Sequence, residues 1–375
     1  MDAKKKIVFV QNIITPYRCN TFNLLYQYDH RYEVFYMSRT ENDRNWDIPV
    51  SEMKHEYWLD KTGIYFSIKG FHIHLNPVLI SKILFSRNIG SVVLGASYCD
   101  VNILILSLFK RLRFTNKKYY CWAEANYLTN GARKDSRFKS FLRKFVYGCV
   151  DGAAIVPGKM AKITLEKWGT SFKRYIDFPN TIDESALIYN SQLRNKNLSV
   201  PIILMPVRLI ENLKGLINFF DAIGRCNVEK AIFLVAGEGK DRELYEKYIK
   251  ENSYNDHIKL LGFCNSEKMK DLYNEANLLV LPSISDPSPL TIVEALRFHL
   301  PILCSSHCGN HFEAVKTGVN GYTFSPLDKN DIKTTFEKML SQHENWNKMG
   351  EQSAMIYDKT FRLDVVVKNL MQNID

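Results

Sequence analysis

The segment SISDPSPLTIVEALRFHLPI contains two acids, Asp286 and Glu294, with seven residues between them. The apolar period after the turn predicts a helix, and Pro289 suits its first turn. The amides of Leu290 and Thr291 would then be helix N-terminal donors that favour an anion. Glu294 would lie about one turn further in, where its carboxylate can accept hydrogen bonds from two neighbouring hydroxyls, as on a ribose. The pattern predicts a loop-to-helix site for a charged ligand; two incidental surface acids are the alternative.

Other candidate ligand contacts also follow predicted strands. In MPVRLIENLKG, Arg208 leaves a strand and Lys214 stands near the start of the next helix. Two cations beside a helix N-terminus suit a diphosphate, although solvated loop bases are the alternative. Gly237 belongs to a G-x-G turn, which is weak support for a nucleotide site. Backbone exposed beside Phe263 could hydrogen-bond a flat base.

A compact group of possible metal ligands occurs in CSSHCGNH. Its spacing fits none of the paired short-loop patterns of structural zinc sites. We therefore expect no metal site there, and we interpret the group as loop residues beside a ligand pocket. The group consists of Cys304, His307, Cys308 and His311.

The elements that must position these residues alternate between short β-branched runs and helical patterns along the whole chain. Such alternation implies right-handed β-α-β units and parallel sheets. The pattern restarts after the polar segment 180–200, so we expect an α/β protein of two doubly wound, Rossmann-like domains facing each other across a cleft. Their expected bounds are 1–183 and 184–354, with a helix in 355–375 packing back on the first domain. Ligands of such sheets bind beyond the carboxyl ends of the strands, where all the candidate residues fall.

The composition of the chain predicts a globular protein and excludes some classes of partner. The 375 residues are 46% hydrophobic and 24% charged, as in a globular protein with two cores. The net charge of +10 would suit nucleic acid, an anionic membrane or phosphorylated substrates. No nucleic-acid recognition motif is present, so we expect no such partner. The longest apolar stretch, 91–109, is interrupted by Asp100 and Asn102, and the eight cysteines are scattered, so we expect a reduced, cytoplasmic protein.

The second half of the chain resembles the retaining family 4 glycosyltransferases (glycosyl transferases group 1) of the GT-B fold. The resemblance rests on FPNTID, PVRLIENLKG, VAGEGKDREL, GNHFEAVKTGVNGYTF and the spacing of Asp286 and Glu294, which the family usually fills with two glutamates. It implies a nucleotide-diphosphate sugar as donor, and neither a metal nor another cofactor. Arg208 and Lys214 would bind the diphosphate and stabilise its departure. Glu294 would bind the ribose, Asp286 the transferred sugar, and the chain near Phe263 the base.

The departures from the family pattern concern mainly the catalytic centre and the acceptor. Many members carry a histidine after a strand in the middle of the first domain, where this chain has CWAEANY. Glu124 is the candidate replacement, with a structural acid as the alternative, and Asn126 is the second candidate. Acceptor binding belongs to the N-terminal domain in this fold, which points to Thr15, Tyr17, Arg18 and Asn126. The prolines after Asp286 remove two amide donors, so the two cations would do more of the diphosphate binding.

The acceptor is expected to be a glycan or a lipid-linked saccharide, as in cell-surface polysaccharide synthesis. The segment SRFKSFLRKFVYGC combines phenylalanines with Arg137, Lys139, Arg143 and Lys144, next to Arg133 and Lys134. Such a helix could rest on the inner face of an anionic membrane, or it could be a core-packed helix with a basic outer side. A nucleotide-sugar epimerase of similar architecture is the alternative to a transferase.

Overall fold

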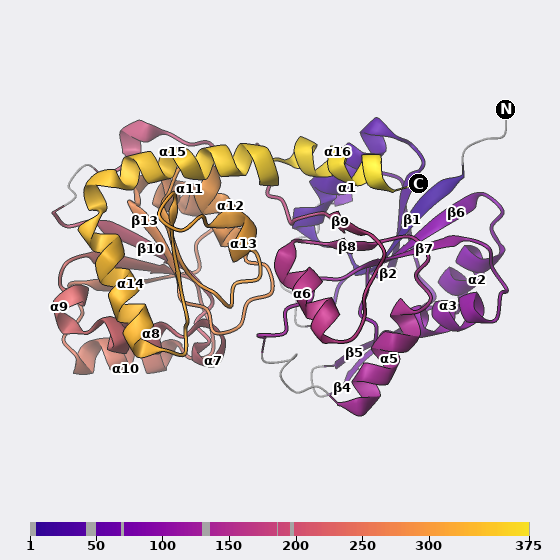
Figure 1. Ribbon diagram of the computed structural model, residues 1–375, viewed down its shortest axis with the longest axis horizontal. Helices are drawn as coiled ribbons and strands as arrows, with labels where there is room; N and C mark the ends of the chain where they lie inside the picture. Colours follow the sequence, from indigo (N-terminus) through magenta and orange to yellow (C-terminus); the bar gives the residue numbers. More distant parts are fainter. Residues whose placement is uncertain are drawn as a thin grey trace.

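The computed structural model describes residues 5–42, 50–68, 71–129, 136–185, 187–195 and 199–374. It has two α/β lobes side by side along the long axis of the molecule, each with helices around a sheet (Figure 1). Every strand pair of the two large sheets is parallel, so the predicted α/β architecture is confirmed. Within the described ranges, no helix combines the length and apolar character needed to cross a membrane.

The N-terminal lobe contains a seven-stranded sheet in the order β3-β2-β1-β6-β7-β8-β9. The order reverses between β1 and β6, so this is the topological switch point where loops diverge and a crevice forms. The strands are β1 (Lys6–Ile13), β2 (Tyr32–Ser38), β3 (Tyr57–Leu59), β6 (Ile89–Leu94), β7 (Lys118–Trp122), β8 (Ala154–Val156) and β9 (Tyr175–Asp177). The helices are α1 (Pro16–Tyr28), η1 (Val50–Glu52), α2 (Pro77–Phe85), α3 (Val101–Arg111), α5 (Arg137–Tyr147) and α6 (Lys159–Lys167).

The C-terminal lobe contains a six-stranded sheet in the order β12-β11-β10-β13-β14-β15, with its switch point between β10 and β13. The strands are β10 (Ile202–Pro206), β11 (Ile232–Ala236), β12 (Ile258–Gly262), β13 (Leu278–Leu281), β14 (Ile302–Ser305) and β15 (Gly321–Phe324). The helices are η2 (Ser191–Leu193), α7 (Glu211–Lys214), α8 (Leu216–Ile223), α9 (Arg225–Val228), α10 (Arg242–Glu251), α11 (Ser266–Glu275), α12 (Leu290–Arg297), α13 (His311–Ala314), α14 (Lys329–Ser341), η3 (His343–Asn345) and α15 (Trp346–Ile356).

A β-hairpin that the sequence analysis did not anticipate is added to the N-terminal lobe. It consists of β4 (Ile64–Ile68) and β5 (Phe71–Leu75), which pair antiparallel as a separate two-stranded sheet. The hairpin packs on α3 and on β2. Its sequence, IYFSIKGFHIHL, alternates apolar and polar residues on both sides of the dipeptide Lys-Gly, a pattern typical of a hairpin.

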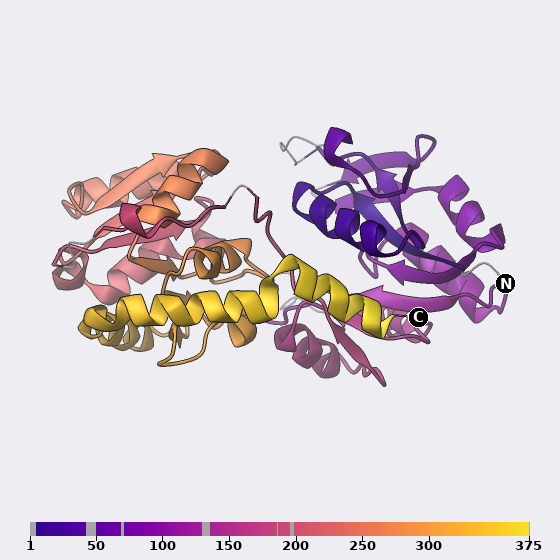
Figure 2. The same cartoon turned by 90° about the horizontal axis from the view of Figure 1, so that it is seen from above.

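The C-terminal end of the chain crosses back from the second lobe to the first (Figures 1 and 2). After α15, a π-helical turn (Tyr357–Phe361) leads into α16 (Leu363–Asn373). The apolar side chains of α16 join the core beneath α1 and β1, and they are Val366, Val367, Leu370 and, just beyond the helix, Ile374. Glu184, in the connection between the lobes, accepts hydrogen bonds from Tyr357 Oη at 2.9 Å and from the Leu363 amide at 3.2 Å. The two lobes are therefore joined by two chain crossings that are bonded to each other.

Candidate functional site

Two loops of the C-terminal lobe meet at its switch point. The loop after β10 ends in α7, and the carbonyl of Leu213 accepts hydrogen bonds from the amides of Ile284 and Ser285 at 2.9 and 3.0 Å. These bonds hold the loop after β13 against α7 and bring Lys214 and Asp286 together. Lys214 Nζ and Asp286 Oδ2 form an ion pair, with the two side chains only 12% and 13% exposed. The structure thus joins two residues that the sequence analysis assigned separately to the diphosphate and to the sugar.

The loop after β14 supports this arrangement from the neighbouring strand. His307 Nδ1 lies 2.8 Å from the carbonyl oxygen of Ile284, and the Gly309 amide donates to the Asp286 carbonyl at 3.0 Å. A Cβ on Gly309 would lie 1.7 Å from the Pro287 carbonyl oxygen, so only glycine allows the two loops to approach this closely. The CSSHCGNH segment therefore packs on the loop that carries Asp286. In the part of the chain that the structure describes, no group of three or more His, Cys, Asp or Glu side chains is arranged to hold a metal.

Glu294 lies one turn into α12 and is half-buried. Tyr273 Oη donates a 2.5 Å hydrogen bond to its Oε2, and the Tyr273 ring stacks on Phe298 with centroids 5.1 Å apart. Burial raises the pKa of the Glu294 carboxyl, and the hydrogen bond from Tyr273 offsets part of that rise. Sequence analysis missed Tyr273, which lies on α11, because the contact depends on how two helices pack. The predicted donors Leu290 and Thr291 open α12, where helix geometry leaves their amides without intrahelical partners.

The remaining residues predicted to bind a donor lie around the same edge of the sheet. Arg208 follows β10 and is exposed. Phe263 follows β12, with 81% of its surface exposed. The amide of Gly237 donates to the Gly262 carbonyl at 2.8 Å, so it is already used within the protein. A Cβ at Gly237 would lie 2.0 Å from the Val207 carbonyl oxygen, which shows that this glycine is required for loop packing.

A second candidate site is a cavity of about 830 Å³ in the N-terminal lobe, at the end of β1 and β6. Four of the residues predicted for catalysis or acceptor binding line it, namely Thr15, Tyr17, Arg18 and Glu124. Arg18 Nη2 donates to Glu124 Oε1 at 2.7 Å, and its guanidinium lies 4.2 Å from the centroid of the Trp122 ring. Glu124 is thus already engaged in an ion pair at the cavity wall.

Asn126 does not line this cavity, in contrast to the expected acceptor contact. Its Nδ2 donates across the lobe boundary to the carbonyls of Asp286 at 3.3 Å and His307 at 2.9 Å. Its Oδ1 accepts from the Leu128 amide at 3.0 Å. Because both ends of the side-chain amide are used, Asn126 ties the N-terminal lobe to the loop that carries the Lys214–Asp286 pair.

One wall of the N-terminal cavity was missed by the sequence analysis. It is contributed by the hairpin, by the end of β1 and by the loops after β2 and β6, and its polar members are Asn12, Glu41, His72, His74 and Asp100. The alternation in IYFSIKGFHIHL could have revealed the hairpin. The position of its histidines against two distant acids could not have been read from local sequence.

Comparisons with known proteins concern the family and the fold of the chain. Residues 190–355 match the family described as Glycosyl transferases group 1. An uncharacterized glycosyltransferase from Methanocaldococcus jannaschii is 30% identical over 111 residues, 30% of this chain and 28% of that protein. The chain therefore spans less than a third of that curated relative. Sucrose-phosphate synthase from Thermosynechococcus elongatus superposes with a TM-score of 0.73 at 14% identity, covering 98% of both chains. The Anabaena protein HepE, solved in complex with UDP, gives a TM-score of 0.71 at 12% identity, also over 98% of both chains.

Proposed function

The chain carries a Glycosyl transferases group 1 domain in a GT-B fold, and from this premise we propose that it is a retaining glycosyltransferase. Its donor is a nucleotide-diphosphate sugar, and its acceptor is a glycan or a lipid-linked saccharide, as in cell-surface polysaccharide synthesis. HepE is a structural neighbour that binds UDP, so UDP-sugars are the first donors to test. The observation that carries the proposal is the Lys214–Asp286 pair at the switch point of the C-terminal sheet, one loop away from Glu294.

In the proposed donor complex, Arg208, Lys214 and the amides of Leu290 and Thr291 hold the diphosphate. Cations and helix N-terminal amides stabilise the negative charge that develops as the diphosphate departs. They take the role that a divalent cation would otherwise have, so the proposed reaction uses no metal or other cofactor. The two hydroxyls of the ribose bind Glu294, which is already oriented by its hydrogen bond from Tyr273.

The proposed transfer occurs on one face of the sugar. The bond from the anomeric carbon to the diphosphate oxygen breaks, and the acceptor hydroxyl forms the new bond on the same side. The hydroxyl proton passes to the departing diphosphate oxygen. The transition state has oxocarbenium character, and Asp286 assists by accepting a hydrogen bond from a hydroxyl of the transferred sugar, because such bonds strengthen in the transition state. Glu124, held by Arg18, is proposed to face the acceptor on the opposite wall.

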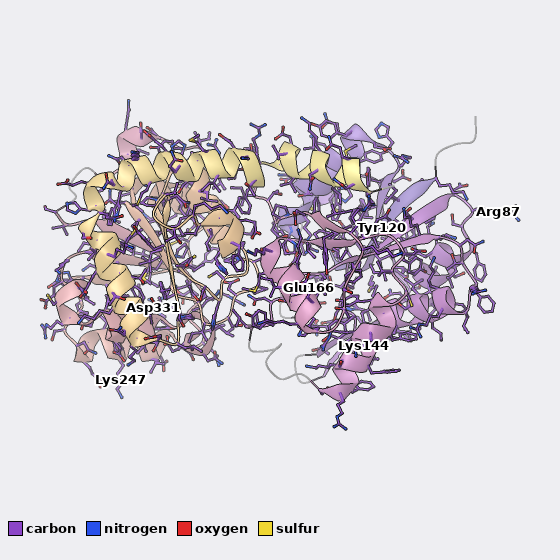
Figure 3. All side chains as sticks on the ribbon, viewed as in Figure 1. Arg87, Tyr120, Lys144, Glu166, Lys247 and Asp331 are labelled. Carbon is purple, nitrogen blue, oxygen red and sulfur yellow. The ribbon has the colours of Figure 1, made fainter. Side chains whose placement is uncertain are left out.

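The proposed location is cytoplasmic, with peripheral contact to the inner face of an anionic membrane through α5. Phe138 and Phe141 are 68% and 63% exposed on this helix. Lys144 is exposed on the same helix and is labelled in Figure 3. Arg143, which the sequence analysis counted among the surface bases, is buried instead, and its guanidinium lies 4.4 Å from the Trp168 ring centroid. The predicted bases Arg133 and Lys134 lie outside the described residues.

The proposal is tested by incubating the full chain with a panel of nucleotide sugars and following its melting temperature. A true donor should raise the apparent stability, because a ligand that binds only the folded state stabilises it. Transfer to a saccharide acceptor, with the anomeric configuration of the product read by NMR, would establish the reaction and its stereochemistry. Interconversion of the donor sugar without any acceptor would instead identify an epimerase. Absence of stabilisation and turnover with every nucleotide sugar would refute the proposed function.

A further inference from the structure

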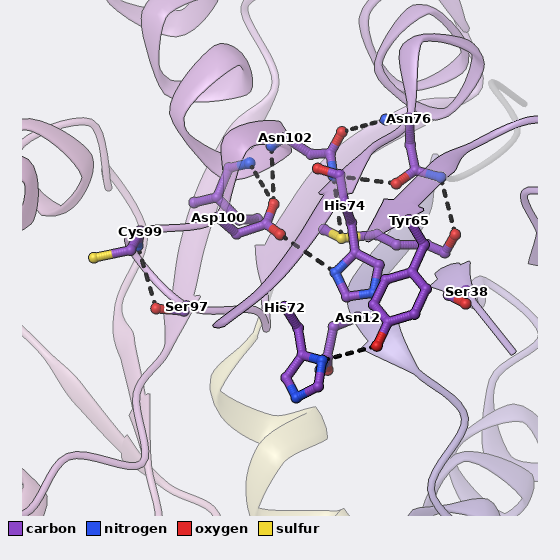
Figure 4. Close-up of polar contacts among 12 residues, drawn as sticks. Asn12, Ser38, Tyr65, His72, His74, Asn76, Ser97, Cys99, Asp100 and Asn102 are labelled. Carbon is purple, nitrogen blue, oxygen red and sulfur yellow. Dashed lines mark hydrogen bonds and ion pairs between the residues drawn. The ribbon is translucent and has the colours of Figure 1, made fainter. Parts of the chain in front are cut away.

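The hairpin places His74 between two carboxylates that are distant in sequence, those of Glu41 and Asp100. Figure 4 shows His74 beside Asp100. His74 is 2% exposed. Its Nε2 lies 3.7 Å from Glu41 Oε1, and its Nδ1 lies 3.9 Å from Asp100 Oδ2. Both distances exceed the usual hydrogen-bond length, so the ring faces the acids without being bonded to either.

The three groups are held in place by their neighbours. The His74 ring stacks on Tyr65 with centroids 5.0 Å apart and 22° between the planes. Asp100 uses its Oδ1 to cap α3, accepting from the Asn102 amide at 2.9 Å, which leaves Oδ2 on the histidine side. Asn12 Nδ2 donates to Glu41 Oε1 at 2.9 Å. The wall is therefore preorganised, as a recognition surface requires.

Three buried nitrogens of side chains that line this cavity have no hydrogen-bond partner among the described residues, namely His74 Nε2, Trp122 Nε1 and Arg18 Nε. The His74 and Trp122 side chains are more than nine-tenths buried. Leaving a buried donor or acceptor unpaired costs roughly 1–3 kcal/mol, so such groups are expected to meet a polar ligand or solvent. Nitrogens beside carboxylate acceptors match the alternating donors and acceptors of a polyol.

The charged side chains that line the cavity limit the charge of the ligand that can bind there. Its described lining includes three carboxylates, on Glu41, Asp100 and Glu124, but among lysines and arginines only Arg18. Arg18 is already paired with Glu124. An anionic sugar would therefore meet an excess of negative charge here, although the whole chain carries +10. Aromatic side chains supply apolar faces for the carbon skeleton of a ring, namely Tyr17, Tyr98, Trp122, Tyr147 and Trp168.

We propose that this cavity binds an uncharged, hydroxyl-rich sugar ring of the acceptor, with His74, Glu41 and Asp100 recognising its hydroxyls and Trp122 contributing its indole N–H. This inference rests on the proposed function, because it names the acceptor class of the same enzyme. It excludes uronic acids and phosphorylated sugars from the position next to the transfer site. The hairpin β4–β5 is then the specificity element of the N-terminal lobe.

The test uses the full chain with UDP present and a panel of methyl glycosides, and binding is measured by saturation-transfer NMR and calorimetry. The neutral members are the methyl glycosides of glucose, galactose, mannose and N-acetylglucosamine; methyl glucuronoside and methyl glucoside 6-phosphate are the anionic members. His74→Phe replaces the imidazole with a phenyl ring, which can still stack on Tyr65 but has no nitrogen. We expect at least one neutral glycoside to bind. His74→Phe should lower the affinity for that glycoside about tenfold, as expected for a lost buried hydrogen bond.

His55→Phe is the matched control, since His55 is equally buried in the same lobe but contacts Asn23 and Tyr36 and does not line the cavity. If His74→Phe does not fold, Trp122→Phe carries the same test, because it removes the indole N–H from the cavity and keeps a smaller aromatic ring in its place.

The possible results distinguish a failure of this inference from a failure of the proposed function. Binding of UDP-sugars, together with an anionic glycoside that binds as tightly as the neutral ones, would overturn this inference and leave the proposed function intact. So would neutral binding that is unchanged in both cavity variants, or no neutral binding at all. Neutral binding that depends on His74 while no nucleotide sugar binds would overturn the acceptor role and the proposed function together.

Discussion

Lys214 and Asp286 form an ion pair between the loops that follow two adjacent strands, β10 and β13. The pair is largely shielded from solvent, so its charges are screened less than those of a surface pair. The cation expected to bind the donor diphosphate is therefore already neutralised by the acid expected to bind the sugar. Any diphosphate that enters the site must share Lys214 with Asp286 or displace it.

Asp286→Asn should change UDP affinity and turnover in opposite directions. Removing the carboxylate frees Lys214 and removes the repulsion between Asp286 and the diphosphate, so UDP affinity should rise by roughly 3–10-fold, which corresponds to about 1 kcal/mol. Turnover should fall on the order of 10²-fold, because an interaction made in the transition state is lost. Calorimetry with UDP and steady-state kinetics measure the two effects. Lys214→Met is the reciprocal variant and should bind UDP more weakly than the parent. Weaker UDP binding by Asp286→Asn would contradict a competition between Asp286 and the diphosphate for Lys214.

Donor binding should depend on pH through Glu294. Burial raises the pKa of this carboxyl, and only its charged form accepts from both ribose hydroxyls without supplying a proton. Donor affinity should thus fall as pH falls through that raised pKa. Tyr273→Phe removes the bond that partly offsets the rise, so the loss should begin at a higher pH. The KM for the donor, measured from pH 5 to 8, reports the shift.

Two variants serve as controls for the Glu294 prediction. Glu294→Gln should flatten the pH profile, because it removes the titrating group. Tyr245→Phe deletes a comparable bond, 2.8 Å long, to Glu211 and should leave the profile unchanged. An identical profile in Tyr273→Phe and the parent protein would rule out the ribose role of Glu294.

Asn126→Asp should weaken the contact between the lobes. The variant keeps the oxygen that accepts from the Leu128 amide, so the local turn survives. It replaces the donor to the carbonyls of Asp286 and His307 with a carboxylate oxygen that repels them. We expect kcat to fall at least tenfold, because two buried hydrogen bonds between the lobes are lost. Small-angle scattering should show a more open molecule; an unchanged kcat would show that these contacts of Asn126 with the C-terminal lobe do not support turnover.

The membrane contact of α5 predicts a loss of lipid binding in Phe138→Ser/Phe141→Ser. Each phenylalanine buried in the interface contributes roughly 1.5–3 kcal/mol, so the double variant should lose at least tenfold in partitioning to anionic liposomes. Flotation at low salt measures this. Leu244→Ser/Leu327→Ser is the control, since both residues are exposed apolar positions on the C-terminal lobe. A parent protein that does not float would contradict the membrane contact.

Asp100→Asn should stabilise the fold at neutral pH more than at acid pH. Burial raises the pKa of Asp100 from 3.8 to about 6, so the folded state binds the extra proton between these values. The stability that Asp100 contributes is therefore lost as pH rises from about 4 to 6. Asparagine caps a helix equally well and does not ionise. Between pH 4.5 and 7.5, the free energy of unfolding of the variant, measured in urea, should rise relative to that of the parent by on the order of 2 kcal/mol.

Asp328→Asn is the control for the Asp100 prediction, because Asp328 also caps a helix through its side chain but is exposed. Its stability difference from the parent should not change with pH in the same way. Equal pH responses of the two variants would show that Asp100 is not protonated in the folded state.

The sequence by itself determined the two parallel sheets and the edge of each sheet at which candidate residues gather. β-branched runs alternating with amphipathic stretches allow only β-α-β units, and in parallel sheets the carboxyl ends of all strands lie on one side. The positions of Arg208, Lys214, Asp286 and Glu294 at one edge follow from that rule. Terminal helix α16 also follows its predicted period, over residues 363–373.

The tertiary structure alone decided which of these residues touch. The pairing of Lys214 with Asp286 depends on β13 lying beside β10, an order that local periodicity does not encode. The Gly237 amide is used in packing between loops, and the Asn126 side chain in the contact between the lobes; neither contact could be read from the local sequence. His74 meets Glu41 and Asp100 only because a hairpin folds over the end of the sheet. Contacts between segments far apart in the chain are set by packing of whole elements, and this is the information that a local pattern lacks.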